Sequence, residues 1–198
     1  DERRIHMYTN CIRPYFRAPH MYIGTPARFV DFRTKIPEHP NRGISDGVLM
    51  GSRDGLRFQR WEEAFIRPSD ELEVWTDRNN YPVLGSVQTS SDELSLYWSE
   101  HNKHPSKRIR RGTIRLDGFV SLHTGGNVGE VLTRPLVFSG SRLEVNYATS
   151  AVGSLRFELC NTQGEPFDGF SFHNSEIVFG NELEHTVNWY GHGDLNKL

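Results

Sequence analysis

The sequence has few cysteines, no long apolar run and almost no net charge. Cys11 and Cys160 lie in unrelated segments and share no metal-ligand spacing, so we expect two unpaired thiols. No apolar run approaches the roughly 20 residues of a membrane-spanning helix, and no membrane span is predicted. A formal net charge of −2 over 198 residues produces no overall field that favours nucleic acid.

Several sequence signatures of enzymes are also missing. The chain has no Gly-rich phosphate loop, no Cys-x-x-Cys, no Gly-x-Ser-x-Gly and no His-Glu-x-x-His. Nucleotide-binding and serine-hydrolase functions therefore have no support, and we expect neither a cofactor nor a metal ion. The first residues, Asp1 to Arg4, are charged and precede no apolar region, so they are not predicted to be a signal peptide.

The residues that are present have the pattern of an all-β protein. Short apolar or alternating runs are separated by clusters of Gly, Pro, Asn and Ser, which is typical of strands and turns. Besides residues 5–8, the predicted strands are 20–24, 27–32, 47–51, 57–61, 83–89, 94–99, 109–116, 119–123, 132–138, 142–147, 154–160, 170–173, 176–179 and 185–189.

The pattern changes near residue 118. Loops before this point are long and rich in His, Arg and Trp, whereas later strands alternate cleanly, with Leu143, Val145 and Tyr147 on one face. Such alternation indicates sheets with one buried and one solvated face. We therefore predict two domains, 1–118 and 119–198. Residues 15–70 and 80–120 each contain strands and turns at a spacing similar to one four-stranded propeller blade.

One hairpin is the most informative segment of the first domain. An apolar strand that starts at Val48 leads into the turn Asp54-Gly55, and a second strand follows it. Asp-Gly suits a tight turn because Gly adopts positive φ without steric cost. The hairpin Ser-x-Asp-Gly-x-x-aromatic resembles a blade hairpin of carbohydrate-active β-propellers.

Longer stretches resemble bacterial glycoside hydrolase family 32-like five-bladed β-propeller proteins. These stretches are YFRAPHMYIG at 15–24, SRDG at 52–55 and RRGTIRLDGFVS at 110–121. The resemblance implies about two blades of a partial five-bladed β-propeller, followed by an incomplete β-sandwich that is truncated at the C-terminus. It also implies hydrolysis of glycosidic bonds, a carbohydrate partner and an extracytoplasmic or secreted location.

The family's catalytic carboxylates are not recognisable here. The family pattern has a nucleophilic Asp in the first blade, an Arg-Asp-Pro in a middle blade and an acid/base Glu in the next. In this chain Arg53-Asp54 is followed by Gly55. We therefore assign no catalytic residue and expect the carboxylates to lie upstream of Asp1, with this fragment supplying pocket wall and scaffold.

Propeller geometry predicts which loops face a ligand. We place the starts of the innermost strands near 17–20 and 79–81, and the returning loops at 53–55 and 100–104. Arg, His and Asn hydrogen-bond sugar hydroxyls, and Tyr provides a stacking face. The predicted substrate-binding residues are Arg17, His20, Asp54, Asn80, Tyr81, Glu100 and His101.

These residues also have structural interpretations. Asp54 is explained as a turn former by the following Gly. His20 is equally well a buried, satisfied histidine, and Arg17 equally well a clamp within a blade. Glu100 and His101 lie in a loop with His104, a spacing that fixes no metal geometry. Two other functions remain open: a non-catalytic glycan-binding propeller, and a structural β module. The sequence does not indicate the oligomeric state.

Overall fold

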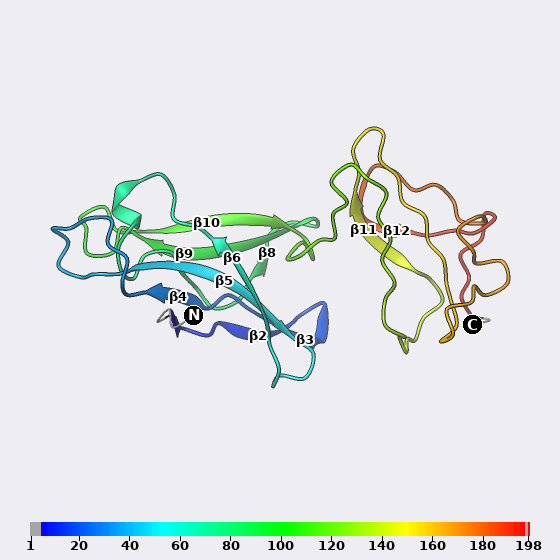
Figure 1. Cartoon of the computed structure of the whole chain (residues 1–198), viewed down its shortest axis with the longest axis horizontal. Coiled ribbons are helices and arrows are strands. Elements are labelled where there is room, and N and C mark those ends of the chain that lie inside the picture. The colour runs from blue at the N-terminus through cyan, green and yellow to red at the C-terminus, as the bar shows by residue number, and fades with distance from the viewer. Residues whose placement is uncertain (1–4, 197) are drawn as a thin grey trace. The chain divides into compact units, whose positions relative to one another are not determined.

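The chain folds into two compact units. The computed structural model describes residues 5–196 and 198, so the predicted absence of a signal peptide at residues 1–4 lies outside the described residues. The units are Asp1–Phe119 and Val120–Leu198. In the sequence, the division between them falls one residue after the predicted domain boundary. The described residues contain strands and one 3₁₀ turn, η1 (Leu72–Val74), but no α-helix (Figure 1). The all-β prediction is confirmed.

A six-stranded antiparallel sheet occupies the first part of unit 1. Its pairing order is β1-β4-β5-β3-β2, and β6 lies on the other side of β5. Because β3 and β4 both pair with the same edge of β5, they are two halves of one long strand, as are β1 and β2. The strands are β1 (Ile5–Tyr8), β2 (Ile12–Tyr15), β3 (Ala18–Gly24), β4 (Ala27–Val30), β5 (Ile44–Ser52) and β6 (Gln59–Ile66).

This sheet is therefore a meander of four long strands, 5–15, 18–30, 44–52 and 59–66. The breaks within the first two strands have local causes. Cys11 has a φ of 50°, outside the range of strand backbone. Pro26 has no N–H for a ladder, although its carbonyl accepts a hydrogen bond from the Val48 N–H at 3.1 Å.

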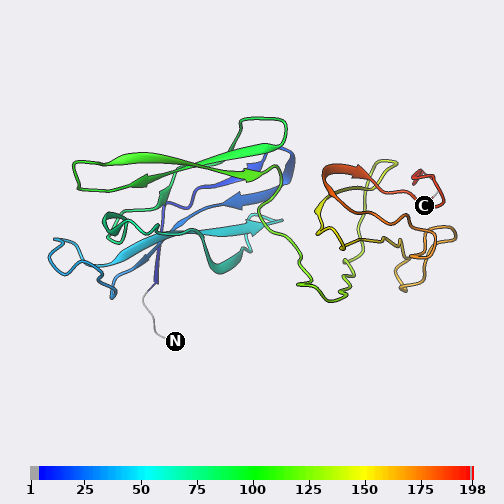
Figure 2. The same cartoon turned by 90° about the horizontal axis from the view of Figure 1, so that it is seen from above.

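A second sheet follows, with the order β10-β9-β7 and with β8 also paired to β9. It consists of β7 (Tyr81–Pro82), β8 (Val87–Gln88), β9 (Glu93–Glu100) and β10 (Arg108–Arg115). Because β7 and β8 pair with the same edge of β9, they are two parts of one long strand, and the sheet is a meander of three long strands. Figure 2 shows the second sheet above the first, and β5 and β7 are in contact between them. At Gly47, an added Cβ would lie 2.8 Å from the Pro82 ring, so this contact requires glycine.

Because neighbouring strands run antiparallel, the connections of unit 1 lie at two opposite ends of its sheets. We call the end with connections 31–43, 67–80 and 101–107 the loop end, and the end with 16–17, 53–58, 89–92 and 116–119 the turn end. At the loop end, the Asn80 side chain donates to the Ser45 carbonyl at 2.9 Å. At the turn end, Tyr15 and Arg17 both donate to Asp117. The nine residues of β5 put about 26 Å between the ends.

Unit 2 has little regular structure. Its described residues contain one two-stranded sheet, β11 (Glu144–Ala148) and β12 (Asn181–Thr186), with a bulge between Val145 and Tyr147. A small core is formed by Phe170, Val187, Trp189 and Leu195. The strands predicted at 154–160 and 176–179 contribute isolated bridges, including Leu155 to Val178.

The strands predicted at 119–123 and 132–138 are wrong. Residues 120–140 are exposed and form no strand. Their apolar side chains have the right pattern for a strand, but they pair with no described strand, and Pro135 lacks a donor for a ladder. Cys11 and Cys160 are both free thiols.

Candidate functional site

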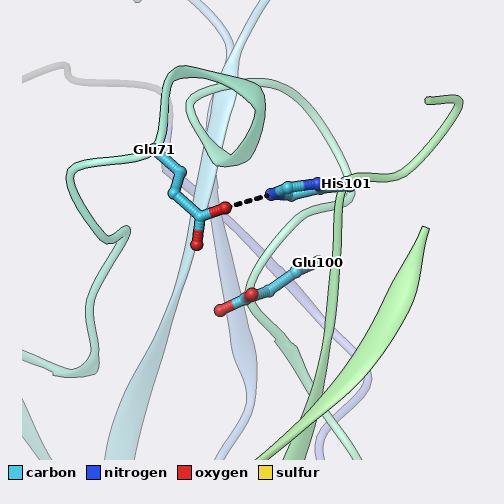
Figure 3. Close-up of side chains that lie close together, drawn as sticks. All are labelled: Glu71, Glu100 and His101. Carbon is cyan, nitrogen blue, oxygen red and sulfur yellow. Dashed lines mark ion pairs between the residues drawn. The ribbon is translucent and has the colours of Figure 1, made fainter. Parts of the chain in front are cut away.

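Five charged or ionisable side chains meet at the loop end of unit 1. We call this group the carboxylate–arginine cluster: Glu71, Glu100, His101, Arg108 and Arg110. Glu100 is the last residue of β9 and pairs in register with Arg108, the first residue of β10. Arg110 lies two residues further along, so it projects from the same face as Arg108. Glu71 comes from the connection 67–80, just before η1. Figure 3 shows Glu71, Glu100 and His101 converging on one region.

Glu100 forms the buried floor of the cluster. Only 2% of the residue is exposed, and a buried carboxylate needs hydrogen-bonding or ionic partners. Its Oε1 accepts from Trp98 Nε1 at 2.9 Å. Its Oε2 accepts from Arg108 Nε at 2.9 Å and lies 3.4 Å from Arg110 Nη1. Both arginines are thus held in place from below by one carboxylate.

Glu71 covers the same two arginines from the solvent side. Its Oε1 accepts from Arg108 Nη2 and lies 3.3 Å from Arg110 Nη1, and 35% of its side chain is exposed. The hydrogen bond from Arg108 is the main reason that the pKa of Glu71 is lowered below its ordinary value. The carboxylate is therefore ionised at neutral pH and bound to two guanidinium groups.

His101 completes the cluster from the 101–107 loop. Its side chain is buried, its Nδ1 lies 2.6 Å from Ser106 Oγ, and its Nε2 faces Glu71 Oε2 at 3.1 Å. Despite this short distance, Nε2 and Glu71 are not aligned for a hydrogen bond, and no other described residue hydrogen-bonds to Nε2. A buried ring nitrogen is thus directed at the carboxylate position without a well-aligned partner, which is energetically unfavourable.

The arrangement disfavours two kinds of chemistry. One ligand atom each from Glu71, Glu100 and His101 lie within 4.8 Å of one another, a spacing that fits a metal ion. A cation must, however, displace Arg108 and Arg110 from the same carboxylate oxygens.

The two carboxyl groups are also about as close as those of retaining glycosidases. A general acid needs a raised pKa, whereas that of Glu71 is lowered. In this structure the two arginines instead hold the carboxylate of Glu71.

Four of the seven predicted binding residues lie at the loop end. Glu100 and His101 belong to the cluster. Asn80 is fully buried, and its side-chain amide donates to the carbonyls of Ser45 and Val74 at 2.9 and 3.1 Å, so it links the two sheets and faces no solvent. Tyr81 is half-buried at the start of β7, and burial raises the pKa of its hydroxyl.

The other three predicted residues lie at the turn end. Arg17 pairs with Asp117 at 3.1 Å, and His20 is exposed on β3. Asp54 Oδ1 accepts from the backbone N–H groups of Leu56 and Arg57, both at 2.8 Å, so Asp54 forms its own turn. The structure does not bring the seven residues into one site, because antiparallel pairing puts their loops at opposite ends.

Sequence reasoning did not identify Glu71, Arg108 or Arg110 as site residues. Arg110 lies in the predicted strand 109–116 and Arg108 one residue before it, so their spacing of two residues is a usable signal once the strand is extended to Arg108. Glu71 has no such signal, since its position depends on how a long connection folds back over the sheet.

Comparison with protein-family models, with curated proteins and with solved structures found no match to this chain. The family resemblance therefore stays a prediction. Among the described residues, no helix is both long and apolar enough to cross a membrane.

A separate pocket of about 200 Å³ lies between the two sheets of unit 1, lined by residues that include Cys11, Tyr15, Leu96 and Phe119. None of the seven predicted binding residues lines it. The cluster at the loop end is therefore the stronger candidate for recognition of a polar ligand.

Proposed function

We propose that unit 1 represents two adjacent blades of a carbohydrate-active β-propeller and that its loop end contributes to the wall of a glycan-binding pocket. The support is the strand order: a four-stranded antiparallel meander is followed by a three-stranded one that lies against it. Propellers are built from four-stranded blades that pack face to face around a channel. By the same resemblance, unit 2 is an incomplete β-sandwich that serves as scaffold, and the protein acts outside the cytoplasm.

The pairing identifies the ligand face on this proposal. In a propeller blade, the start of the innermost strand and the connection between the second and third strands lie at the same face. With 5–15 as the innermost strand of the first blade, that connection is 31–43, and in the second blade it is 101–107. Both belong to the loop end. An innermost strand that starts near 17–20, as predicted from the sequence, puts the turn around Asp54 on the ligand face instead.

The cluster supports a binding role within a glycoside hydrolase, with the main catalytic carboxylates elsewhere. Glu71 is bound to arginines and its pKa is lowered, so it is unsuited to donate a proton, and Glu100 is buried beneath the same arginines. Arg and His donors at a pocket rim hydrogen-bond sugar hydroxyls or carboxylates. The observation that carries this proposal is the half-exposed Arg108–Glu71–Arg110 arrangement above buried Glu100.

A non-catalytic glycan-binding propeller is the second candidate. It is favoured by the same neutralised carboxylates, and it differs from the first only in whether the pocket cleaves what it binds. A purely structural module requires instead that the loop end binds no sugar.

The test is titration of the 198-residue chain with a panel of neutral and acidic oligosaccharides, together with an assay for released reducing sugar. We expect binding without release. Arg110→Gln should weaken binding, whereas Asp54→Asn at the turn end should leave it unchanged and is the matched control. No binding to any oligosaccharide, or equal losses in the two variants, would contradict a glycan site at the loop end.

A further inference from the structure

The carboxylate–arginine cluster already holds a carboxylate that belongs to the protein. Nitrogen atoms of Arg108, Arg110 and His101 surround the Glu71 carboxylate, with distances of 3.3 Å from Arg110 Nη1 and 3.1 Å from His101 Nε2. Glu71 is about one-third exposed and comes from a connection, whereas the nitrogen donors come from β10 and the adjoining loop. The occupant is thus the one member of the cluster that comes from neither the β9–β10 strands nor the loop that joins them.

The donors stay in place without Glu71, because Glu100 holds them from below. Glu100 is buried, is fixed by Trp98 and accepts from Arg108 Nε at 2.9 Å. Removal of Glu71 would leave two guanidinium groups opposite one carboxylate. His101 Nε2 is buried and has no well-aligned hydrogen bond, so it is a polar position beside the carboxylate that Glu71 does not satisfy.

The surroundings of the cluster also favour an anion. The segment 101–111 contains five Lys or Arg residues and no Asp or Glu. Guanidinium groups present a planar fork that matches the two oxygens of a carboxylate. A ligand carboxylate that replaced Glu71 would meet both arginines and the unsatisfied His101 nitrogen.

We propose that the cluster binds the carboxylate of an acidic glycan, a uronic acid residue, in the position that Glu71 occupies in the free protein. This inference rests on the proposed glycan-binding function and specifies its substrate class. Glu71 then acts as an internal competitor, which weakens binding and closes the site when no acidic sugar is present.

The test is calorimetric titration of the 198-residue chain with trigalacturonate and with the neutral galactose trimer of the same length. The acidic trimer should bind more tightly than the neutral one. Glu71→Gln removes the competing charge but keeps the side-chain shape, and it should tighten trigalacturonate binding roughly two- to fivefold, the usual strength of a partly exposed ion pair. Its effect on the neutral trimer should be negligible.

Two arginine variants provide the loss of function and its control. Arg110→Gln should weaken trigalacturonate binding roughly tenfold, because a hydrogen bond to a charged group is removed. Arg111→Gln is the matched control: the neighbouring residue on β10 points to the other face and pairs with Glu93 at 2.6 Å. Thermal unfolding of each variant checks that the chain remains folded.

The outcomes separate this inference from the proposed function. Equal binding of both trimers, lost in Arg110→Gln, would overturn the preference for acidic sugars and leave glycan binding intact. No binding of either trimer would overturn this inference, and no binding of any oligosaccharide of the panel would overturn the proposed function as well. Equal losses in Arg110→Gln and Arg111→Gln, or equally tight binding of a DNA oligonucleotide, would show a nonspecific basic edge and would also overturn the inference.

Discussion

Replacing Glu100 by Gln should destabilise unit 1 more than replacing any exposed acid of the same sheet. The Glu100 carboxylate is 2% exposed, accepts from Arg108 Nε at 2.9 Å and lies 3.4 Å from Arg110 Nη1. The side-chain amide of the glutamine keeps an oxygen that accepts from Trp98, but it lacks the negative charge that pairs with both arginines. Loss of one partner from a fully buried ion pair costs about 3–5 kcal/mol.

The expected loss here is smaller than that range. Arg108 and Arg110 are 37% and 46% exposed and keep Glu71 as a partner, so solvent and Glu71 offset part of the cost. We expect a loss of about 2 kcal/mol in the free energy of unfolding, or roughly 6–10 °C in Tm. Urea unfolding followed by tryptophan fluorescence measures it, since Trp98 donates directly to Glu100.

Glu93→Gln is the matched control for this measurement. Glu93 lies at the opposite end of β9 and pairs with Arg111 at 2.6 Å, but both side chains are solvent-accessible. Exposed pairs contribute about 0.2–1 kcal/mol. If the two variants lose the same stability, Glu100 is not the anchor of the cluster.

Two further predictions concern ion pairs away from the cluster. In unit 2, hydrogen bonds to Glu176 at 2.9 Å and Glu182 at 3.2 Å raise the pKa of His185 above 6.5. The stability that protonated His185 contributes should therefore be fully present below about pH 6.5 and be lost as pH rises through the raised pKa. NMR titration of the ring measures the pKa. Unfolding profiles of the wild type and of His185→Gln at several pH values measure the change in stability. In unit 1, Asp46→Asn breaks the bidentate pair with Arg28, at 2.8 and 2.6 Å, and should cost about 2 kcal/mol in urea unfolding; a loss below about 0.5 kcal/mol would contradict it.

Most strands of unit 1 could be predicted because their signals are local, although β2 (Ile12–Tyr15) was not among the predicted strands. The apolar alternation of β9 and the Asp54-Gly55 turn of the β5–β6 hairpin depend on neighbouring residues alone. In unit 2 the same reasoning failed at 132–138, because a strand needs a partner edge as well as the right pattern. Pairing is non-local, and a single sequence contains no direct information on it.

The candidate site, like the strands, was predictable only where its residues are close in the sequence. Glu100 and His101 are adjacent at the end of a predicted strand, and both were selected from the sequence. Glu71 is 29 residues away from Glu100 in the chain, and only the folded connection brings it above the arginines. The assignment of Arg17 and Asp54 to the same site depended on which strand is innermost, a choice that the pairing of β1 with β4 revises on the propeller proposal.

The most direct test of the central claim is NMR titration of the isotope-labelled chain with trigalacturonate, with the arginine Nε–Hε and histidine ring signals observed. Binding at the loop end predicts saturable shifts of Arg108, Arg110 and His101, with Arg17 at the turn end unchanged. Shifts at Arg17 without shifts at the cluster, or no saturable shift at any of these groups, would contradict it.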